Sequence, residues 1–162
     1  MISRWPRPLF YVITFVVLGL DQATKAWAMA SLQPLGTVPL IPGFFSLTYV
    51  ENRGVAFGMF AGHGAAVALG VVALVLVVLF YSRSLNWAGT EPNLVGGCLC
   101  GGALGNLIDR TRHGWVVDFF DVHISAYHLD WPVFNVADTL ICIAVGWIVL
   151  WQIRGTSKQA NS

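Results

Sequence analysis

Residues Leu9–Ala30, LFYVITFVVLGLDQATKAWAMA, form a run that is long and apolar enough to cross a lipid bilayer. A hydrocarbon core of about 30 Å needs roughly 20 mainly apolar residues in a helix. The only charged residues of the run are Asp21 and Lys25, which stand four positions apart and can therefore pair on one helix face. Ionisable side chains are costly inside a membrane, so this pair is expected to have a structural or functional role.

The same run allows one alternative, a signal peptide that is removed. Arg4 and Arg7 precede it, and Ala28-Met29-Ala30 has the small residues of a cleavage site. The two charges between the apolar run and that site favour a retained span instead.

Three more apolar runs follow along the chain. Ala61–Tyr81 is almost entirely Ala, Val, Leu and Gly, Asn93–Ile108 is shorter and rich in glycine, and Val136–Ile153 has Asp138 near its start. Over the 162 residues, 56% are hydrophobic and 10% are charged, against roughly 25% charged in a soluble domain. We therefore predict one domain, an all-α membrane protein with four transmembrane helices at about 9–30, 61–81, 93–108 and 136–153.

The glycines of the third run have a helical spacing. Gly97, Gly101 and Gly105 recur every fourth residue and so lie on one helix face. Small residues allow membrane helices to approach closely. We expect this helix to pack tightly against a neighbour.

Basic residues predict the orientation of the four spans. With both termini on one side, five basic residues lie on that side and four on the other: Arg4, Arg7, Arg83, Arg154 and Lys158 against Lys25, Arg53, Arg110 and Arg112. The positive-inside rule makes the first side cytoplasmic, by a margin of one residue. All acidic residues except Glu91 then lie at the outer ends of the spans or in the outer segments. The outer face is therefore the expected working face.

Two outer segments are too long to be simple connectors. Within residues 37–60, the aromatic and β-branched run Phe44–Val50 lies between turn signals at Pro42-Gly43 and Asn52-Arg53-Gly54, which predicts a small β-ribbon on the membrane surface. Residues 110–132 mix Trp and Phe with His and Asp, which predicts an interfacial segment that could include a short helix.

Asp118 and Asp138 are the candidate chemical groups. Both are expected at the outer boundary in mainly apolar surroundings, and Asp138 falls in the first turn of its helix if Asn135 caps it. Two carboxylates brought together there would share a proton, so that one acts as a base on water and the other as an acid. This is the machinery of an aspartyl peptidase. From spacing alone, structural pairing of the polar side chains is the simpler alternative.

Other constellations are weaker. The four histidines, at 63, 113, 123 and 128, lack zinc-ligand spacing, and Cys98 and Cys100 project about 200° apart on a helix. A net charge of +1 and the lack of a long basic run give no indication of nucleic-acid binding. Two rivals remain: a small proton-coupled transporter that depends on Asp21, and a metal-dependent membrane hydrolase.

Five blocks of the sequence, in order, resemble the bacterial lipoprotein signal peptidase (signal peptidase II) family. They are Asp21-Gln22-Ala23-Thr24-Lys25, Glu51-Asn52-Arg53-Gly54-Val55-Ala56-Phe57-Gly58, Gly101-Gly102-Ala103-Leu104-Gly105-Asn106-Leu107-Ile108-Asp109-Arg110, Val116-Val117-Asp118-Phe119 and Phe134-Asn135-Val136-Ala137-Asp138. The resemblance extends from the first span to the last.

The resemblance implies a four-span aspartyl endopeptidase of the bacterial inner membrane, with its active site at the periplasmic face. It would cut prolipoproteins just before a cysteine that carries diacylglycerol, among membrane lipids, without a metal or organic cofactor and without nucleic acid. Globomycin-type antibiotics would inhibit it. By position in the motifs, Asp118 and Asp138 correspond to the catalytic pair. Four residues match the substrate-binding set, Asn52, Asn106, Arg110 and Asn135, and three match supporting positions, Asp21, Lys25 and Asp109.

Overall fold

The computed structural model describes residues 6–54, 89–124 and 129–160, with the backbone alone for 129 and 152–160. The predicted span Ala61–Tyr81 lies outside the described residues. In chain order the elements are α1 (Pro8–Trp27), η1 (Ala28–Leu32), β1 (Thr37–Ile41), β2 (Phe45–Asn52), α3 (Thr90–His113), β3 (Val116–Ile124), β4 (Leu129–Asp130) and α4 (Val136–Ala160).

The first predicted span is confirmed as a continuous helix, because the π-helical turn η1 extends α1 to Leu32. Among the described helices, only Pro8–Leu32 is both long and apolar enough to cross a membrane, and α4 has a shorter apolar stretch, Val136–Trp151. The third predicted span is longer than expected: α3 has 24 residues and ends at Gly114, whose φ of 83° is left-handed. A left-handed glycine is a common way to end a helix.

The glycine face of α3 packs against α1, as the spacing predicts. A Cβ atom on Gly97 would lie 2.7 Å from the Cβ of Ile13, and one on Gly101 would lie 2.6 Å from the carbonyl oxygen of Thr14. At Gly105 a Cβ would collide with the carboxylate of Asp21. Glycine at these positions lets the two helix backbones approach closely.

A four-stranded antiparallel sheet, in the order β1-β2-β3-β4, lies at one end of the helices. The predicted ribbon is confirmed as the β1–β2 hairpin, which turns where the N–H of Phe44 donates to the carbonyl of Ile41 and Gly43 adopts a φ of 76°. Glycine is favoured where a turn requires positive φ.

The short helix expected within residues 110–132 is a strand instead, and the all-α class holds only in part because a four-stranded sheet accompanies the helices; the place of this segment at the membrane interface stays a prediction. Residues 110–113 continue α3, and Val116–Ile124 forms β3, which pairs with β2. The physical reason is composition: three valines and two phenylalanines in β3 carry the same β-branched and aromatic signal as Phe44–Val50. The molecule thus combines membrane-type helices with a sheet.

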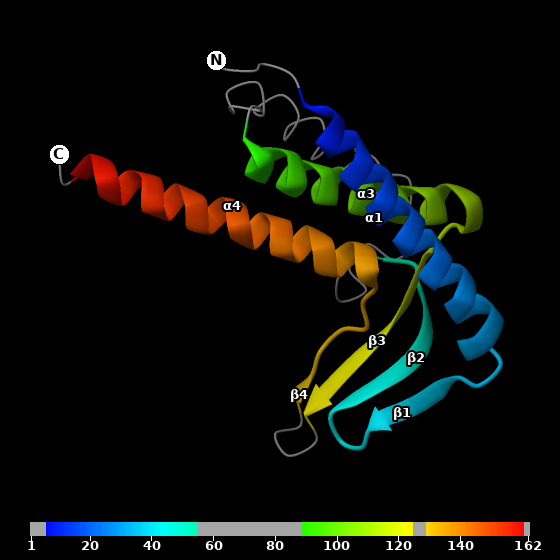
Figure 1. Cartoon of the computed structure of the whole chain (residues 1–162). Coiled ribbons are helices and arrows are strands. Elements are labelled where there is room, and N and C mark those ends of the chain that lie inside the picture. The colour runs from blue at the N-terminus through cyan, green and yellow to red at the C-terminus, as the bar shows by residue number, and fades with distance from the viewer. Residues whose placement is uncertain (1–5, 55–88, 125–128, 161–162) are drawn as a thin grey trace.

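The sheet is fixed to the end of the first helix by an apolar cluster. Ala28 and Leu32 of η1 pack against Val117 and Phe119 of β3, all of them buried. Because successive side chains of a strand point to opposite faces, Asp118 projects away from this cluster. Figure 1 shows α1 crossing α3, and the sheet at the end where α1 and α3 finish and α4 begins.

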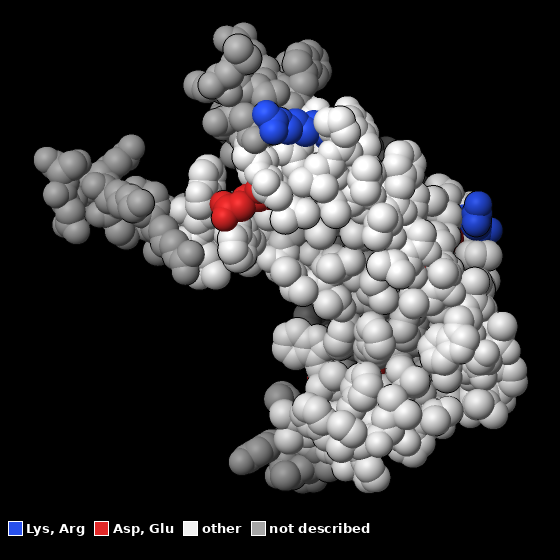
Figure 2. Space-filling view, viewed as in Figure 1, with Lys and Arg blue, Asp and Glu red and all other residues white. Residues whose placement is uncertain are grey.

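The helix surfaces are mostly uncharged. Figure 2 shows only a few charged side chains on one face of the molecule. Large apolar side chains on α1 and α4 are exposed, among them Phe15 at 69%, Ile143 and Trp151. Large exposed apolar surfaces mark contact with a membrane or a partner, and this one continues along two helices.

Candidate active site

Asn135 caps α4 and contacts both candidate aspartates. The backbone N–H of Asp138 donates to Asn135 Oδ1 (2.9 Å), and the backbone N–H of Asn135 donates to Asp138 Oδ2 (3.3 Å). This reciprocal arrangement is a capping box, so the predicted cap and the first-turn position of Asp138 are confirmed. The side-chain amide of Asn135 also donates to Asp118 Oδ1 (2.6 Å). One residue therefore brings the two carboxylates together.

Asp118 is almost completely buried, with 1% of its surface exposed. Asn52 Nδ2 donates to its second oxygen, Oδ2, at 2.8 Å, because β2 pairs with β3 and places Asn52 near it. Burial, and to a smaller extent the negative charge of Asp138, raise the pKa of Asp118 to about 7, while the two asparagine donors act in the opposite direction. A substantial share of this carboxyl group is therefore protonated near neutral pH.

Asp138 has a different environment. Its Oδ1 accepts from Asn106 Nδ2 (2.8 Å) and its Oδ2 accepts from the N–H of Asn135. Its position in the first turn of α4 adds the favourable field of the helix N-terminus. The two carboxyl groups therefore differ in their donors and surroundings, as a pair in which one acts as an acid and the other as a base would require.

The asparagines of the predicted substrate-binding set contact these carboxylates. Asn52, Asn106 and Asn135 each donate an amide N–H to Asp118 or Asp138. The fourth member, Arg110, donates to the backbone carbonyls of Asn106 and Gly54, both at 3.3 Å. The structure thus places all four around the two aspartates, and their contact with substrate stays a prediction.

The predicted supporting residues form a buried cluster beside the aspartates. Lys25 lies between Asp21 (2.9 Å) and Asp109 (3.0 Å), so the expected pairing of Asp21 with Lys25 is confirmed. Asp21 Oδ1 accepts from the N–H of Ala137 at the start of α4 (3.1 Å), and Asp109 Oδ2 accepts from the N–H of Val117 in β3 (3.0 Å). The cluster therefore attaches α1 and α3 to the elements that carry the aspartates. Packing of this kind favours a retained span over a removable signal peptide.

Gln22 was not assigned a role from the sequence. Its Nε2 atom donates to Asp109 Oδ1 (3.0 Å) and lies 3.3 Å from both Asp21 Oδ2 and the carbonyl oxygen of Gly105. The only indication of its role in the sequence is its position between Asp21 and Lys25, in the first of the five blocks that resemble the family.

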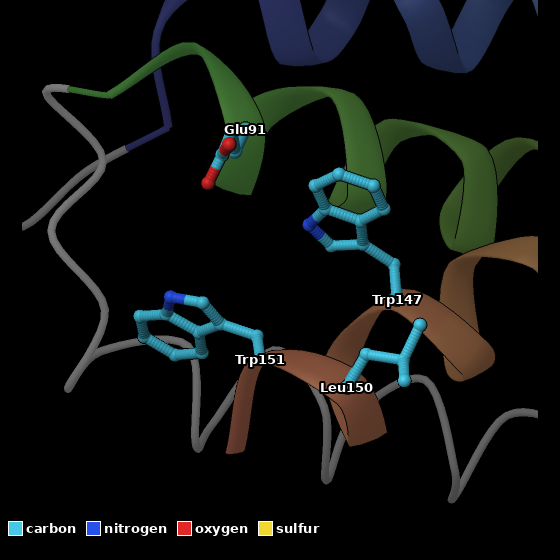
Figure 3. Close-up of a pocket in the computed structure, with 4 residues that line it drawn as sticks. All are labelled: Glu91, Trp147, Leu150 and Trp151. Carbon is cyan, nitrogen blue, oxygen red and sulfur yellow. The ribbon is translucent and has the colours of Figure 1, made fainter. Parts of the chain in front are cut away.

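A separate pocket of about 90 Å³ lies between the start of α3 and the later part of α4. Figure 3 shows Glu91 on the first turn of α3, and Trp147, Leu150 and Trp151 on α4. Glu91 and Asn106 are 15 positions apart on α3, which is roughly 22 Å along a helix. One carboxylate among indole rings offers no acid–base pair, so the pocket is distinct from the candidate active site.

Comparisons with known proteins agree with this geometry. The pattern of the family described as "Signal peptidase (SPase) II" matches residues 13–154. A lipoprotein signal peptidase of Syntrophotalea carbinolica is 40% identical over 94% of this chain and 96% of its own, and one of Geobacter sulfurreducens is 39% identical over 95% and 99%. A solved bacterial membrane enzyme superimposes with a TM-score of 0.84 at 28% identity, over 98% of this chain and 95% of its own. The chain therefore belongs to the signal peptidase II family.

Proposed function

We propose that this protein is a membrane-embedded aspartic endopeptidase that removes the signal peptides of lipoproteins, with Asp118 and Asp138 as its catalytic pair. The reaction follows from the family, whose curated relatives are lipoprotein signal peptidases. The observation that supports the mechanism is the double contact of Asn135, which donates to Asp118 and forms a capping box with Asp138.

In the proposed reaction, Asp138 is ionised and removes a proton from a water molecule. The water oxygen bonds to the carbonyl carbon of the scissile peptide, and Asp118 gives its proton to the carbonyl oxygen. The resulting tetrahedral intermediate has two hydroxyl groups. When the C–N bond breaks, Asp138 gives its proton to the leaving nitrogen, and one hydroxyl returns a proton to Asp118. Both aspartates then have their starting protonation states.

Four side chains are proposed to bind and orient the substrate: Asn52, Asn106, Arg110 and Asn135. They surround the pair, and the Arg110 guanidinium has N–H donors from which a peptide carbonyl or a lipid ester oxygen would accept a hydrogen bond. The proposed substrate carries diacylglycerol on the cysteine that follows the cleaved bond, and globomycin-type antibiotics are proposed to occupy the same site.

A membrane setting follows from the same arrangement. The exposed apolar side chains of α1 and α4 are proposed to face lipid, and the aspartates to lie at the outer surface of the inner membrane, beside the sheet. We propose four spans, with Ala61–Tyr81 as the second and both termini in the cytoplasm. A lipid-bearing substrate would then reach the pair at the bilayer surface.

The test is cleavage by purified protein in detergent, with a prolipoprotein that carries the diacylglyceryl cysteine and its unlipidated form as substrates. Only the lipidated form should be shortened. Asp118→Asn and Asp138→Asn should each abolish cleavage, and the double variant should be scarcely worse, because the pair acts as a unit. Asp130→Asn in β4 is the matched control and should cleave normally.

Two results would contradict the proposal. Substantial cleavage by an inserted, folded Asp118→Asn or Asp138→Asn protein would refute the aspartic mechanism. Activity that disappears with chelator and returns with magnesium or zinc would support the metal-dependent hydrolase. The transporter alternative predicts instead that Asp21 is essential and Asp118 expendable, with no shortened product.

A further inference from the structure

The ammonium group of Lys25 uses all of its donors inside the protein. Lys25 is 1% exposed, and its Nζ atom lies 2.9 Å from Asp21 Oδ2, 3.0 Å from Asp109 Oδ2 and 2.8 Å from Asn106 Oδ1. A lysine ammonium has three N–H donors and no acceptor. Two of the contacts are to the carboxylates of Asp21 and Asp109 and balance their charge. The third contact is to the neutral amide of Asn106, and charge balance does not explain it.

That third contact fixes which way the amide of Asn106 points. Asn106 Oδ1 accepts from Lys25 and is also 3.2 Å from Asn135 Nδ2, so two donors hold the oxygen. The NH2 group on the other side of the amide then donates to Asp138 Oδ1 (2.8 Å). A reversed amide would point its NH2 group at an ammonium and its oxygen at a carboxylate, and both contacts would be repulsive. Only the hydrogen-bond network distinguishes the two orientations, since they have the same shape.

We propose that Lys25 is a positioning residue for the reaction: by binding the oxygen of Asn106, it keeps the amide N–H directed at Asp138 and so holds that carboxylate in place to act on water. This inference rests on the proposed function, in which Asp138 is the base. Two observations support this inference. Lys25 can only donate hydrogen bonds, and a single amide, that of Asn106, links Lys25 to Asp138. Lys25 never touches the substrate in this scheme.

The charged groups around the pair come from four elements. They are Asp21 and Lys25 from α1, Asp109 and Arg110 from α3, Asp118 from β3 and Asp138 from α4. The neighbouring residue of β2, Asn52, is neutral. Lys25 is thus one of two cations in this set, and its charge also acts on Asp118, whose pKa it lowers. Removing the charge of Lys25 should therefore move the alkaline limb of the pH profile, which depends on Asp118, to higher pH.

A purely structural role makes a different prediction. If Lys25 acted only through its charge, a variant that removes it while the local charge stays constant would keep the kcat and the pH profile of the unmodified protein per folded molecule. The test must therefore keep the local charge constant while removing the donor. The three charges of Asp21, Asp109 and Lys25 sum to −1, and the double variant Asp21→Asn/Lys25→Gln leaves Asp109 alone, which is again −1.

The experiment compares the unmodified full-length protein, which keeps the Lys25 donor, with Asp21→Asn/Lys25→Gln, which does not; the charges at the three positions sum to −1 in both. Asp21→Asn alone is the control for the loss of that carboxylate. Glutamine can present either its oxygen or its NH2 group to Asn106, so it no longer fixes the amide. The double variant should lose about 10- to 100-fold in kcat relative to both the unmodified protein and Asp21→Asn, with KM changed less than about 3-fold. Its pH profile should shift upward by roughly one unit. Asp21→Asn/Lys25→Arg restores a donor-only cation and should recover part of kcat and the original profile.

Thermal unfolding in detergent measures the folded fraction of each variant, so kcat is expressed per folded molecule. The inference is overturned if the double variant keeps the kcat and pH profile of the unmodified protein or of Asp21→Asn, or if kcat falls with no shift in the profile. It is also overturned if arginine recovers nothing in a folded protein. Failure of the proposed function would look different, because Asp138→Asn would then cleave whatever residue stands at position 25.

Discussion

Substitution of Asn135 gives the most specific test of the site, because its side chain both caps α4 and donates to Asp118, and these two roles can be removed separately. Its Oδ1 caps α4 by accepting from the N–H of Asp138 (2.9 Å), and its Nδ2 donates to Asp118 Oδ1 (2.6 Å). Serine caps helices about as well as asparagine, but its side chain is too short to reach Asp118. Asn135→Ser should therefore keep the cap and lose the donor, while Asn135→Ala should lose both.

The expected magnitudes follow from these contacts. Loss of a donor to a buried carboxyl group costs about 1–3 kcal/mol, which both variants share. Loss of the cap costs about 1 kcal/mol more in the alanine variant, or roughly 2–4 °C in the midpoint of thermal unfolding for a chain of this size. Cleavage should fall about 100-fold in both, because Asp118 is no longer held in place.

The assay combines cleavage of the lipidated prolipoprotein with thermal unfolding in the same detergent. Equal activities with unequal midpoints, alanine below serine, are the expected result. Near-normal cleavage by Asn135→Ser would refute the view that the amide orients Asp118. Equal midpoints for the two variants would refute the assignment of Asn135 as a stabilising cap.

Five further predictions concern the protonation of Asp118, the helix contact at Gly101, the membrane orientation and the effect of a chelator. Cleavage should decline as pH rises above about 7, since Asp118 then loses the proton it donates, and a pH–rate profile that stays flat through pH 7 would contradict this. Because the folded-state pKa of Asp118 is raised from 3.8 to about 7, the free energy of unfolding should also decrease across that interval and level off above it, as measured by unfolding at fixed pH values. Gly101→Ala should destabilise the protein by about 1–3 kcal/mol because its Cβ has no room against α1, whereas Gly19→Ala, which meets nothing within 4 Å, should not. A reporter that is active only outside the cytoplasm, fused after Ser162, should give no signal, and a strong signal would overturn the proposed orientation. Cleavage of the lipidated prolipoprotein should persist in excess chelator.

Local features of the site could be predicted from the sequence. The spacing of Asn135 and Asp138 predicts a helix cap, and the spacing of Asp21 and Lys25 predicts an ion pair, because each depends on one helical turn. Both are present. The glycine face of α3 was also predictable, since helical periodicity alone places Gly97, Gly101 and Gly105 together.

The long-range contacts could not be predicted in this way. Asn52 reaches Asp118 only because β2 pairs with β3 in a register that places Val50 opposite Asp118. That register depends on recognising β3 as a strand, and its Trp, His and Asp neighbours favoured an interfacial segment instead. The contact of Lys25 with Asn106 joins residues 81 positions apart, and no local pattern specifies it.

The dispersed origin of the site has a consequence for biosynthesis. Asp118 lies on a strand and Asp138 on the final helix, and the side chains and backbone groups that orient them come from elements spread between Asp21 and α4. No partial chain that lacks the last helix contains both carboxyl groups. With Asp118 and Asp138 as the proposed catalytic pair, a nascent polypeptide would be inert toward neighbouring membrane proteins until its C-terminal helix has docked, and peptidase activity would report complete assembly of the fold.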